Sequence, residues 1–209
     1  MGQGKTGNKT SNDAALLQQE RMHPYRSVLF FALVGSSILF LSMVIMFIIW
    51  VSHHPPIDNF QLPKTFIIST LVLLFSSYSI SFIQRYYKED NARALLLSLT
   101  GALVLSGFFT ILQVSSWKTL YDSGFYIDGE IGMTFLYAIT GLHFAHFGGG
   151  MIYLFYLWLK AFDIWNDPVR SLLYFSNKYE GVRLELFSTY WHFLDGIWLF
   201  LFLTFLFTF

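Results

Sequence analysis

The residues best suited to chemistry in this 209-residue chain lie in two apolar segments near its C-terminus. His192 and Asp195 are three residues apart in "STYWHFLDGIW", and His143 and His146 are three apart in "TGLHFAHFGGG". Residues at this spacing share one face of a helix. An imidazole near a carboxylate can relay a proton, two imidazoles can ligate a haem, and all four side chains can form hydrogen bonds between helices.

The two segments place these side chains at a similar depth if both cross a membrane. At about 1.5 Å per residue, His192 lies roughly 12 Å from the start of the last segment, and His143 lies roughly 18 Å from the start of the preceding one. The segments run in opposite directions, so in a core about 30 Å thick both histidines lie roughly 12 Å from the same side. Ionisable residues at that depth normally face the protein interior and have a polar partner.

Three interpretations of these residues stay open: a structural hydrogen-bond cluster, a proton or ion path, and a haem held between His143 and His192. A haem needs a gap as wide as its ring, whereas Gly141, Ala145 and Gly149 form a small-residue seam typical of close helix packing. We therefore expect a buried polar packing cluster. Its predicted members are Gln113, His143, His146, Glu185, His192 and Asp195.

The composition indicates that membrane helices hold these residues. Hydrophobic residues make up 55% of the chain and charged residues only 12%, whereas a soluble domain usually has about 25% charged residues. The chain has no cysteine, which excludes thiolate metal sites, iron–sulfur clusters and covalently attached haem. Its formal net charge of zero gives no indication of nucleic-acid binding.

Five apolar segments approach or exceed the roughly 20 residues that cross a hydrocarbon core. Backbone polar groups in lipid must be satisfied within each segment, so all five are predicted to be helices. We expect an all-α integral membrane bundle over residues 22–209, preceded by a polar N-terminal tail over residues 1–21. The predicted spans are approximately 27–51, 64–86, 92–117, 131–162 and 184–209.

The distribution of Lys and Arg predicts the orientation of the bundle. All of the 13 Lys and Arg residues except Lys64 and Lys118 lie in the N-terminal region or near the connections between spans two and three and between spans four and five. Basic residues are enriched on the cytoplasmic side of membrane proteins. The sequence therefore predicts an internal N-terminus and an external C-terminus.

The stretch "YWHFLDGIWLFLF" resembles the last helix of subunit III of the haem–copper oxidases. That helix carries a W-H-F-[VL]-D-x-x-W run with a glutamate seven residues before the histidine. The matching residues here are Glu185, Trp191, His192, Asp195 and Trp198. The stretch "GMTFLYAITGLHFAHFGGG" is similar to the G-x-x-F-x-x-x-x-G-x-H-x-x-H-x-x-x-G helix of the same family.

Further positions agree with this resemblance. Gln113 in "TILQVSSW" matches a glutamine of the family, and Arg170 lies where longer members have an arginine, fifteen residues before the glutamate. Those members have seven helices, and five spans with an internal N-terminus resemble the short bacterial form that lacks the first two. The chain departs from the family at Ser36 and Ser37, where a buried carboxylate is usual.

The resemblance implies a non-catalytic accessory subunit of a proton-pumping terminal oxidase, of the cytochrome c oxidase type, in aerobic respiration. It implies that this chain holds no metal or cofactor and contributes no catalytic residue, while haems and copper lie in other subunits. The subunit would support complex stability, phospholipid binding and proton uptake. Arg170 is a candidate for lipid head groups because a guanidinium binds phosphate bidentately; the alternative is a simple interfacial anchor.

The implied partners are the catalytic subunit I, the other oxidase subunits and phospholipids, with a respiratory supercomplex as a further option and no nucleic acid. The implied location is the bacterial inner membrane, or alternatively the mitochondrial inner membrane. Three other functions stay open: subunit III of a quinol oxidase, a small membrane transporter with proton-carrying histidines, and a haem-bearing membrane anchor. Glu185 favours the cytochrome c branch over the quinol branch.

Overall fold

The computed structural model describes residues 6–54, 64–127 and 129–208, with side chains described from residue 25 onward. Within these ranges all regular secondary structure is helical, which confirms the predicted all-α class. The helices are α1 (Thr6–His53), α2 (Lys64–Ser81), α3 (Ile83–Lys88), α4 (Ala92–Asp122), α5 (Ile131–Asn166), α6 (Pro168–Ser176) and α7 (Lys178–Thr208).

Four helical stretches in the described part of the chain are long and apolar enough to cross a membrane. They are Tyr25–His53, Lys64–Lys88, Ala92–Asp122 and Lys178–Thr208. The predicted spans one, two, three and five are therefore supported by length and composition. The fourth, which corresponds to α5, is not among these four stretches; this helix carries His143, His146 and three consecutive glycines. A fifth span and the orientation stay predictions.

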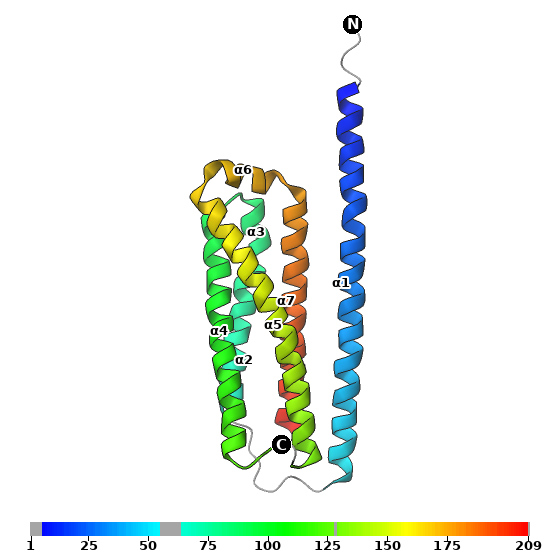
Figure 1. The fold of residues 1–209 in the computed structure, drawn as a ribbon, viewed down its shortest axis with the longest axis vertical. Helices are drawn as coiled ribbons and strands as arrows, with labels where there is room; N and C mark the ends of the chain where they lie inside the picture. The colour runs from blue at the N-terminus through cyan, green and yellow to red at the C-terminus, as the bar shows by residue number, and fades with distance from the viewer. Residues whose placement is uncertain (1–5, 55–63, 128, 209) are drawn as a thin grey trace.

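Figure 1 shows how the long helices are arranged. Helices α2, α4, α5 and α7 form a bundle, and α1 lies along one side of it, in contact with α5 and α7. α6 lies across one end, which we call the α6 end; the C-terminus and the connection between α4 and α5 lie at the opposite end, which we call the far end. The N-terminal part of α1 extends beyond the α6 end.

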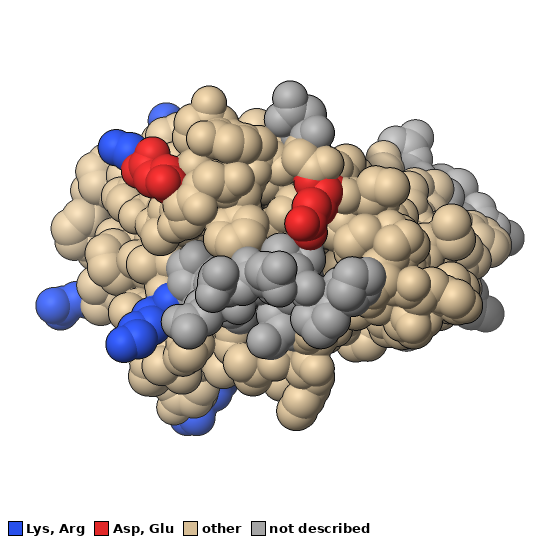
Figure 2. Space-filling view, turned by 90° about the horizontal axis from the view of Figure 1, so that it is seen from below, with Lys and Arg blue, Asp and Glu red and all other residues tan. Residues whose placement is uncertain are grey.

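The far end carries few charges. Seen from that end, the surface is mostly uncharged, with a few scattered acidic and basic side chains (Figure 2). Most Lys and Arg side chains described by the structure lie instead on α3, α6 and the adjoining ends of α4, α5 and α7. The connections in which the sequence concentrates Lys and Arg thus lie together at one end of the bundle.

Local capping determines where the helices at the α6 end begin. Asn91 precedes α4 and accepts a hydrogen bond from the Ala94 N–H at 3.0 Å. Asp167 precedes α6 and accepts one from the Val169 N–H at 2.9 Å, with Pro168 in the first turn. Asn and Asp are favoured caps, and proline is favoured at the first helical position. These two caps mark the residues at which α4 and α6 begin.

Aromatic side chains fill the centre of the bundle. The ring of Phe109 on α4 lies 4.7 Å from Phe147 on α5 and 5.2 Å from Trp198 on α7, and Trp191 lies 5.5 Å from Phe147. The Trp198 indole N–H donates a hydrogen bond to Thr70 on α2 at 3.1 Å. Helix association in a membrane depends on packing and interhelical hydrogen bonds rather than on hydrophobic burial. These aromatic residues therefore fix α7 against three neighbours.

Candidate functional site

His192 connects α7 to α2. Its Nδ1 lies 2.8 Å from the Ser77 hydroxyl, and its Nε2 lies 3.5 Å from the Ser81 hydroxyl. Both serines belong to α2, so the imidazole meets α2, whereas the sequence analysis expected His192 to contact α5. Residue spacing gives a helix face and does not give the neighbouring helix.

His143 lies in an aromatic environment in the centre of the bundle. It is 1% exposed, and its ring centre lies 5.1 Å from Trp198 and 6.2 Å from Phe40. Neither ring nitrogen has a hydrogen-bond partner among the described residues.

Asp195 and Gln113 are also buried, with 6% and 1% exposure. The side-chain oxygen and nitrogen of Gln113 have no hydrogen-bond partner within the described residues. The Asp195 carboxyl lies beside the Ser77 hydroxyl, which also bonds His192. Gln113 lies one turn from Phe109 along α4, and His143 lies one turn from Phe147 along α5, so the Phe109–Phe147 contact brings both to the same level. Buried polar groups of this kind normally bind ordered water.

His146 and Glu185 occupy less buried positions. Nδ1 of His146 lies 2.9 Å from the Leu142 carbonyl oxygen, and its ring centre lies 5.6 Å from Phe40 on α1. Glu185 is about half exposed and accepts a hydrogen bond from Arg26 at 2.8 Å, which joins α7 to α1. Glu185 therefore lies at the surface of the bundle and not in its interior, where the sequence analysis placed it.

The six predicted residues do not form one cluster. In the part of the chain that the structure describes, their hydrogen bonds go to other helices or to their own backbone. His192 and Asp195 share Ser77 as a neighbour, whereas Glu185 pairs with Arg26 of α1. A packing role for the six residues stays a prediction. Trp191 and Trp198, predicted as motif aromatics, lie fully buried in the aromatic centre.

A second group of charged residues, at the α6 end, was not predicted. Glu180 on α7 is buried, and its carboxylate lies 2.7 Å from the Lys160 ammonium and 3.3 Å from the Arg183 guanidinium. Lys160 also lies over the ring of Tyr174 at 5.3 Å. One carboxylate with two cations leaves a net positive charge at this point. Glu180 and Arg183 are three apart, which sequence can show, but Lys160 lies twenty residues earlier on another helix.

Tyr87 holds the same end of the bundle together. Its hydroxyl donates a hydrogen bond to the Asn177 carbonyl at 2.8 Å, at the junction of α6 and α7. Gln84 donates to the Gly181 carbonyl at 3.0 Å. A Cβ at Gly181 would lie only 2.7 Å from Tyr87 Cε1, so glycine is needed for this close approach. Burial raises the pKa of Tyr174, the adjacent residue on α6, and keeps its hydroxyl neutral.

Arg170 is exposed on α6 and is already paired with acidic residues. One guanidinium nitrogen donates to both carboxylate oxygens of Asp163, at 2.6 Å to Oδ1, and another lies 3.3 Å from Asp167. The hydrogen bond to Asp163 raises the pKa of Arg170. A phosphate head group at Arg170, as predicted, would have to compete with both carboxylates.

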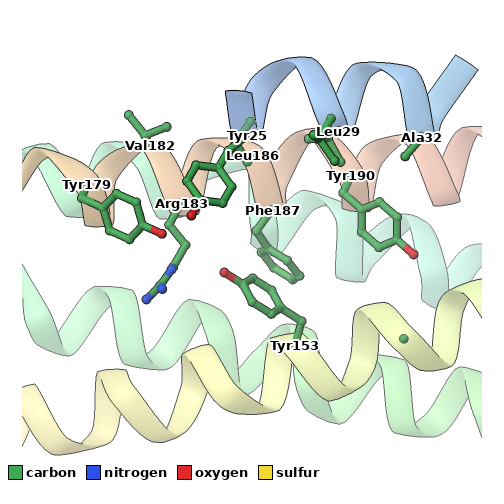
Figure 3. Close-up of a pocket in the computed structure, with 12 residues that line it drawn as sticks. Tyr25, Leu29, Ala32, Tyr153, Tyr179, Val182, Arg183, Leu186, Phe187 and Tyr190 are labelled. Carbon is green, nitrogen blue, oxygen red and sulfur yellow. The ribbon is translucent and has the colours of Figure 1, made fainter. Parts of the chain in front are cut away.

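A cavity of about 450 Å³ lies between α1, α5 and α7 near the α6 end; we call it the α1–α5–α7 pocket. Its walls are mostly apolar and aromatic, and they include Ala32 on α1, Gly149 and Tyr153 on α5, and Phe187 on α7. Arg183 is the charged residue among the residues that line it. Figure 3 shows Arg183 and Tyr179 toward one end of the pocket and Ala32 and Tyr190 toward the other.

Comparison with known proteins agrees with the motifs noted above. The family model described as cytochrome c oxidase subunit III matches residues 25–208. Similar curated proteins include cytochrome c oxidase subunit 3 of Osphranter robustus, 33% identical over 150 residues, of Scyliorhinus canicula, 31% identical over 150 residues, and of Canis lupus, 32% identical over 150 residues. Each match covers 71% of this chain and 51% of the relative, so the chain spans about half the length of the curated relatives it matches.

Proposed function

The chain belongs to the cytochrome c oxidase subunit III family, and from this premise we propose that it is an accessory subunit of a membrane-bound terminal oxidase that carries no redox centre itself. The observation that best supports an accessory role is the use of the motif residues. His192 bonds serines of α2, His143 is surrounded by aromatic rings, and Trp198 bonds Thr70. These residues hold helices together, and haems and copper would lie in other subunits.

The proposed membrane arrangement has five spans, with α5 as the fourth and the α6 end inside. Two facts support α5 as a span: it is 36 residues long, and it packs against α4, α7 and α1, which are candidate spans themselves. The concentration of Lys and Arg at the α6 end supports the orientation. The proposed location is the inner membrane of a bacterium, with the mitochondrial inner membrane as the alternative.

The exposed side of α1 is the proposed contact with the rest of the complex or with its lipids. Phe31, Ile38 and Met46 are 71%, 64% and 57% exposed, although α1 is strongly apolar. This exposed apolar side would meet the catalytic subunit, another oxidase subunit or phospholipid.

Support of proton uptake would come from the positive charge of the α6 end. Arg85, Lys160, Arg170 and Arg183 are each paired with a carboxylate. By contrast, Lys88, Arg93 and Lys178 have no ion pair among the described residues. Unpaired cations determine the local field more than paired ones do. These three lysine and arginine residues are therefore the proposed contributors to the potential on the proton-entry side.

Oxygen consumption by the complex with and without this subunit tests the proposal. We expect an initial rate close to that of the intact complex, because the chain contributes no redox ligand, followed by a shorter active lifetime or slower turnover as the pH rises. An immediate and complete loss of activity at every pH, with haems and copper still present, would exclude an accessory role. An unchanged time course and pH profile would exclude a role in proton uptake.

A further inference from the structure

We propose that the outward face of α6 binds an amphipathic, acidic segment of another subunit of the complex, in the aqueous phase at the α6 end. We call this face, which is formed by Val169, Leu172 and Leu173, the α6 patch. The inference rests on the proposed function, which places the chain in a larger complex. It adds an interaction surface that is separate from the exposed apolar side of α1.

The α6 patch consists of large aliphatic side chains that are mostly exposed. Val169, Leu172 and Leu173 are 66%, 72% and 69% exposed. Their spacing of three and four residues puts them on one side of α6, whereas Tyr174 is buried and faces the bundle. Exposed apolar residues that gather in one patch mark sites of interaction with a protein or a membrane.

The direction in which the patch points favours a protein over a membrane. α6 lies across the end of the bundle (Figure 1). Its buried Tyr174 packs against the ring of Tyr87 on α3 and lies beneath the Lys160 ammonium of α5. The opposite side of α6, which carries the patch, therefore points away from the bundle and from the membrane that the bundle crosses.

The distance of α6 from the hydrocarbon core favours the same conclusion. Arg26 and Glu185 form an ion pair in which both side chains are about half exposed, and such charges are costly inside the core. Lys178 lies seven residues before Glu185 on α7, which is roughly 10 Å at about 1.5 Å per residue. One head-group layer is only about 5–8 Å thick. α6, which ends just before Lys178, thus lies beyond the head groups.

The charges at one end of the patch specify the chemistry of the partner. Asp90, in the turn between α3 and α4, lines a hollow of about 260 Å³ together with Leu172. Lys88 and Arg93 adjoin this turn, Lys178 follows α6, and none of the three has an ion pair among the described residues. Three cations against one carboxylate leave a positive surplus, which carboxylates of a partner would complement.

The other end of α6 carries the opposite surplus. Arg170 pairs with both Asp163 and Asp167, so one cation meets two carboxylates. A partner segment with apolar residues in its middle, carboxylates at one end and a basic residue at the other would match the patch in one direction only.

Photocrosslinking in the intact complex is the first test. p-Benzoylphenylalanine in place of Leu172 or Leu173 should form crosslinks to a peptide of another subunit, which mass spectrometry identifies. Both positions are exposed, so the larger side chain does not disturb the core. The same probe at Asn166, which is exposed at the end of α5 outside the patch, should give about tenfold less of this product.

Carbodiimide coupling tests the charge complementarity. The reagent joins a lysine amine to a carboxylate in contact with it, so Lys88 and Lys178 should couple to the same partner peptide. Lys178→Arg should abolish coupling at that position and leave the photocrosslink from Leu172 unchanged. Lys118, near the far end of α4, should not couple to this peptide. Coupling of the peptide to neither Lys88 nor Lys178 would overturn an acidic partner.

A double variant measures how much the patch contributes to binding. Leu172→Glu with Leu173→Glu should reduce the partner retained after a salt wash about tenfold, equivalent to about 1.4 kcal/mol. Asn166→Glu adds a charge nearby without removing an apolar side chain and should leave retention unchanged. Equal losses in the two variants would overturn the apolar contact.

The alternative occupants give different products. Phospholipid adducts in place of peptide crosslinks would overturn the protein partner, and crosslinks to α6 of a second copy of this chain would replace it with self-association. Absence of any product in a complex that retains its haems and copper would overturn the surface and leave the accessory role intact. A chain that purifies without the oxidase subunits would refute the accessory role and, with it, the partner assigned to α6.

Discussion

Several polar side chains of this protein join neighbouring helices through hydrogen bonds or ion pairs. His192 bonds two serines of α2, Glu185 pairs with Arg26 of α1, and Glu180 pairs with Lys160 of α5. In each case a polar residue of α7 reaches a different neighbour. α7 is therefore the helix whose polar side chains hold the bundle together, and substitutions in it should have separable effects.

Replacing His192 with Leu should weaken the contact between α7 and α2. The variant loses the bond to Ser77 at 2.8 Å and leaves that hydroxyl without its partner, a loss of about 0.5–2 kcal/mol for an interhelical hydrogen bond in a membrane. The temperature at which the complex dissociates should fall, while its metal content stays constant. His192→Asn, which keeps a polar group, is the control. Normal stability of the leucine variant during prolonged turnover would contradict this role.

Gly181→Ala tests the close approach of Tyr87. The added Cβ would lie 2.7 Å from Tyr87 Cε1, so the ring has to move, and its bond to the Asn177 carbonyl is weakened. Overpacking of this kind costs about 1–3 kcal/mol. Thermal denaturation in detergent measures the loss. Gly196→Ala, on the same helix but with nothing within 4 Å of the added Cβ, should leave the midpoint nearly unchanged; equal losses in the two variants would refute the steric explanation.

The helices as elements were largely predictable, and their ends were not. Apolar runs located each long helix, but α4 continues to Asp122 and α7 begins at Lys178, beyond the predicted 92–117 and 184–209. Hydropathy marks the part of a helix that lipid covers, whereas caps and hydrogen bonds determine where the helix stops. α6 fell in a predicted connection, although Asp167 followed by Pro168 is a recognisable start signal.

The contacts between elements were less predictable still. Interhelical partners such as Lys160 and Glu180, or Trp158 and Thr100 at 2.8 Å, are far apart in the sequence. A helix face is defined by its own residues, but the neighbour it meets depends on every connection in the chain. For this reason residue spacing indicates which residues share a helix face, and only the folded chain shows which helix each of them meets.

Glu180→Gln should loosen the junction of α5, α6 and α7. The change leaves Lys160 and Arg183 without a counter-charge, and removal of one partner of a buried pair costs up to about 3–5 kcal/mol, less here because Lys160 is about 29% exposed. Limited proteolysis near α6 should become faster and the thermal midpoint lower. Glu89→Gln, which removes the exposed pair with Arg85, should cost at most about 1 kcal/mol. Similar sensitivity in both variants would argue against a structural junction at Glu180.

At the scale of the whole molecule, two features determine how the protein is placed in a membrane: the end of the bundle that carries most Lys and Arg, and the set of helices that cross the membrane. Among the residues that the structure describes, most Lys and Arg lie at the α6 end, and the far end shows only a few scattered acidic and basic side chains. Four helical stretches in the described part of the chain satisfy the requirements for a span, and α5 packs against three of them. Because α5 contacts other helices on several sides, its His143 is shielded from lipid and does not prevent it from crossing.

Cysteine labelling tests both features, since the chain has no cysteine of its own and gives no background. Glu130 precedes α5 and Asp163 lies near its other end, roughly 50 Å away at about 1.5 Å per residue. If α5 crosses the membrane with the α6 end inside, a membrane-impermeant maleimide should label Glu130→Cys in intact cells and Asp163→Cys only after the membrane is opened. Two further variants are the matched controls. Lys118→Cys, near the far end of α4, should react like Glu130→Cys, and Lys88→Cys, at the end of α3 next to α4, should react like Asp163→Cys. Labelling of Glu130→Cys and Asp163→Cys from one side would exclude α5 as a span, and labelling with all sides exchanged would reverse the orientation while leaving the five-span arrangement in place.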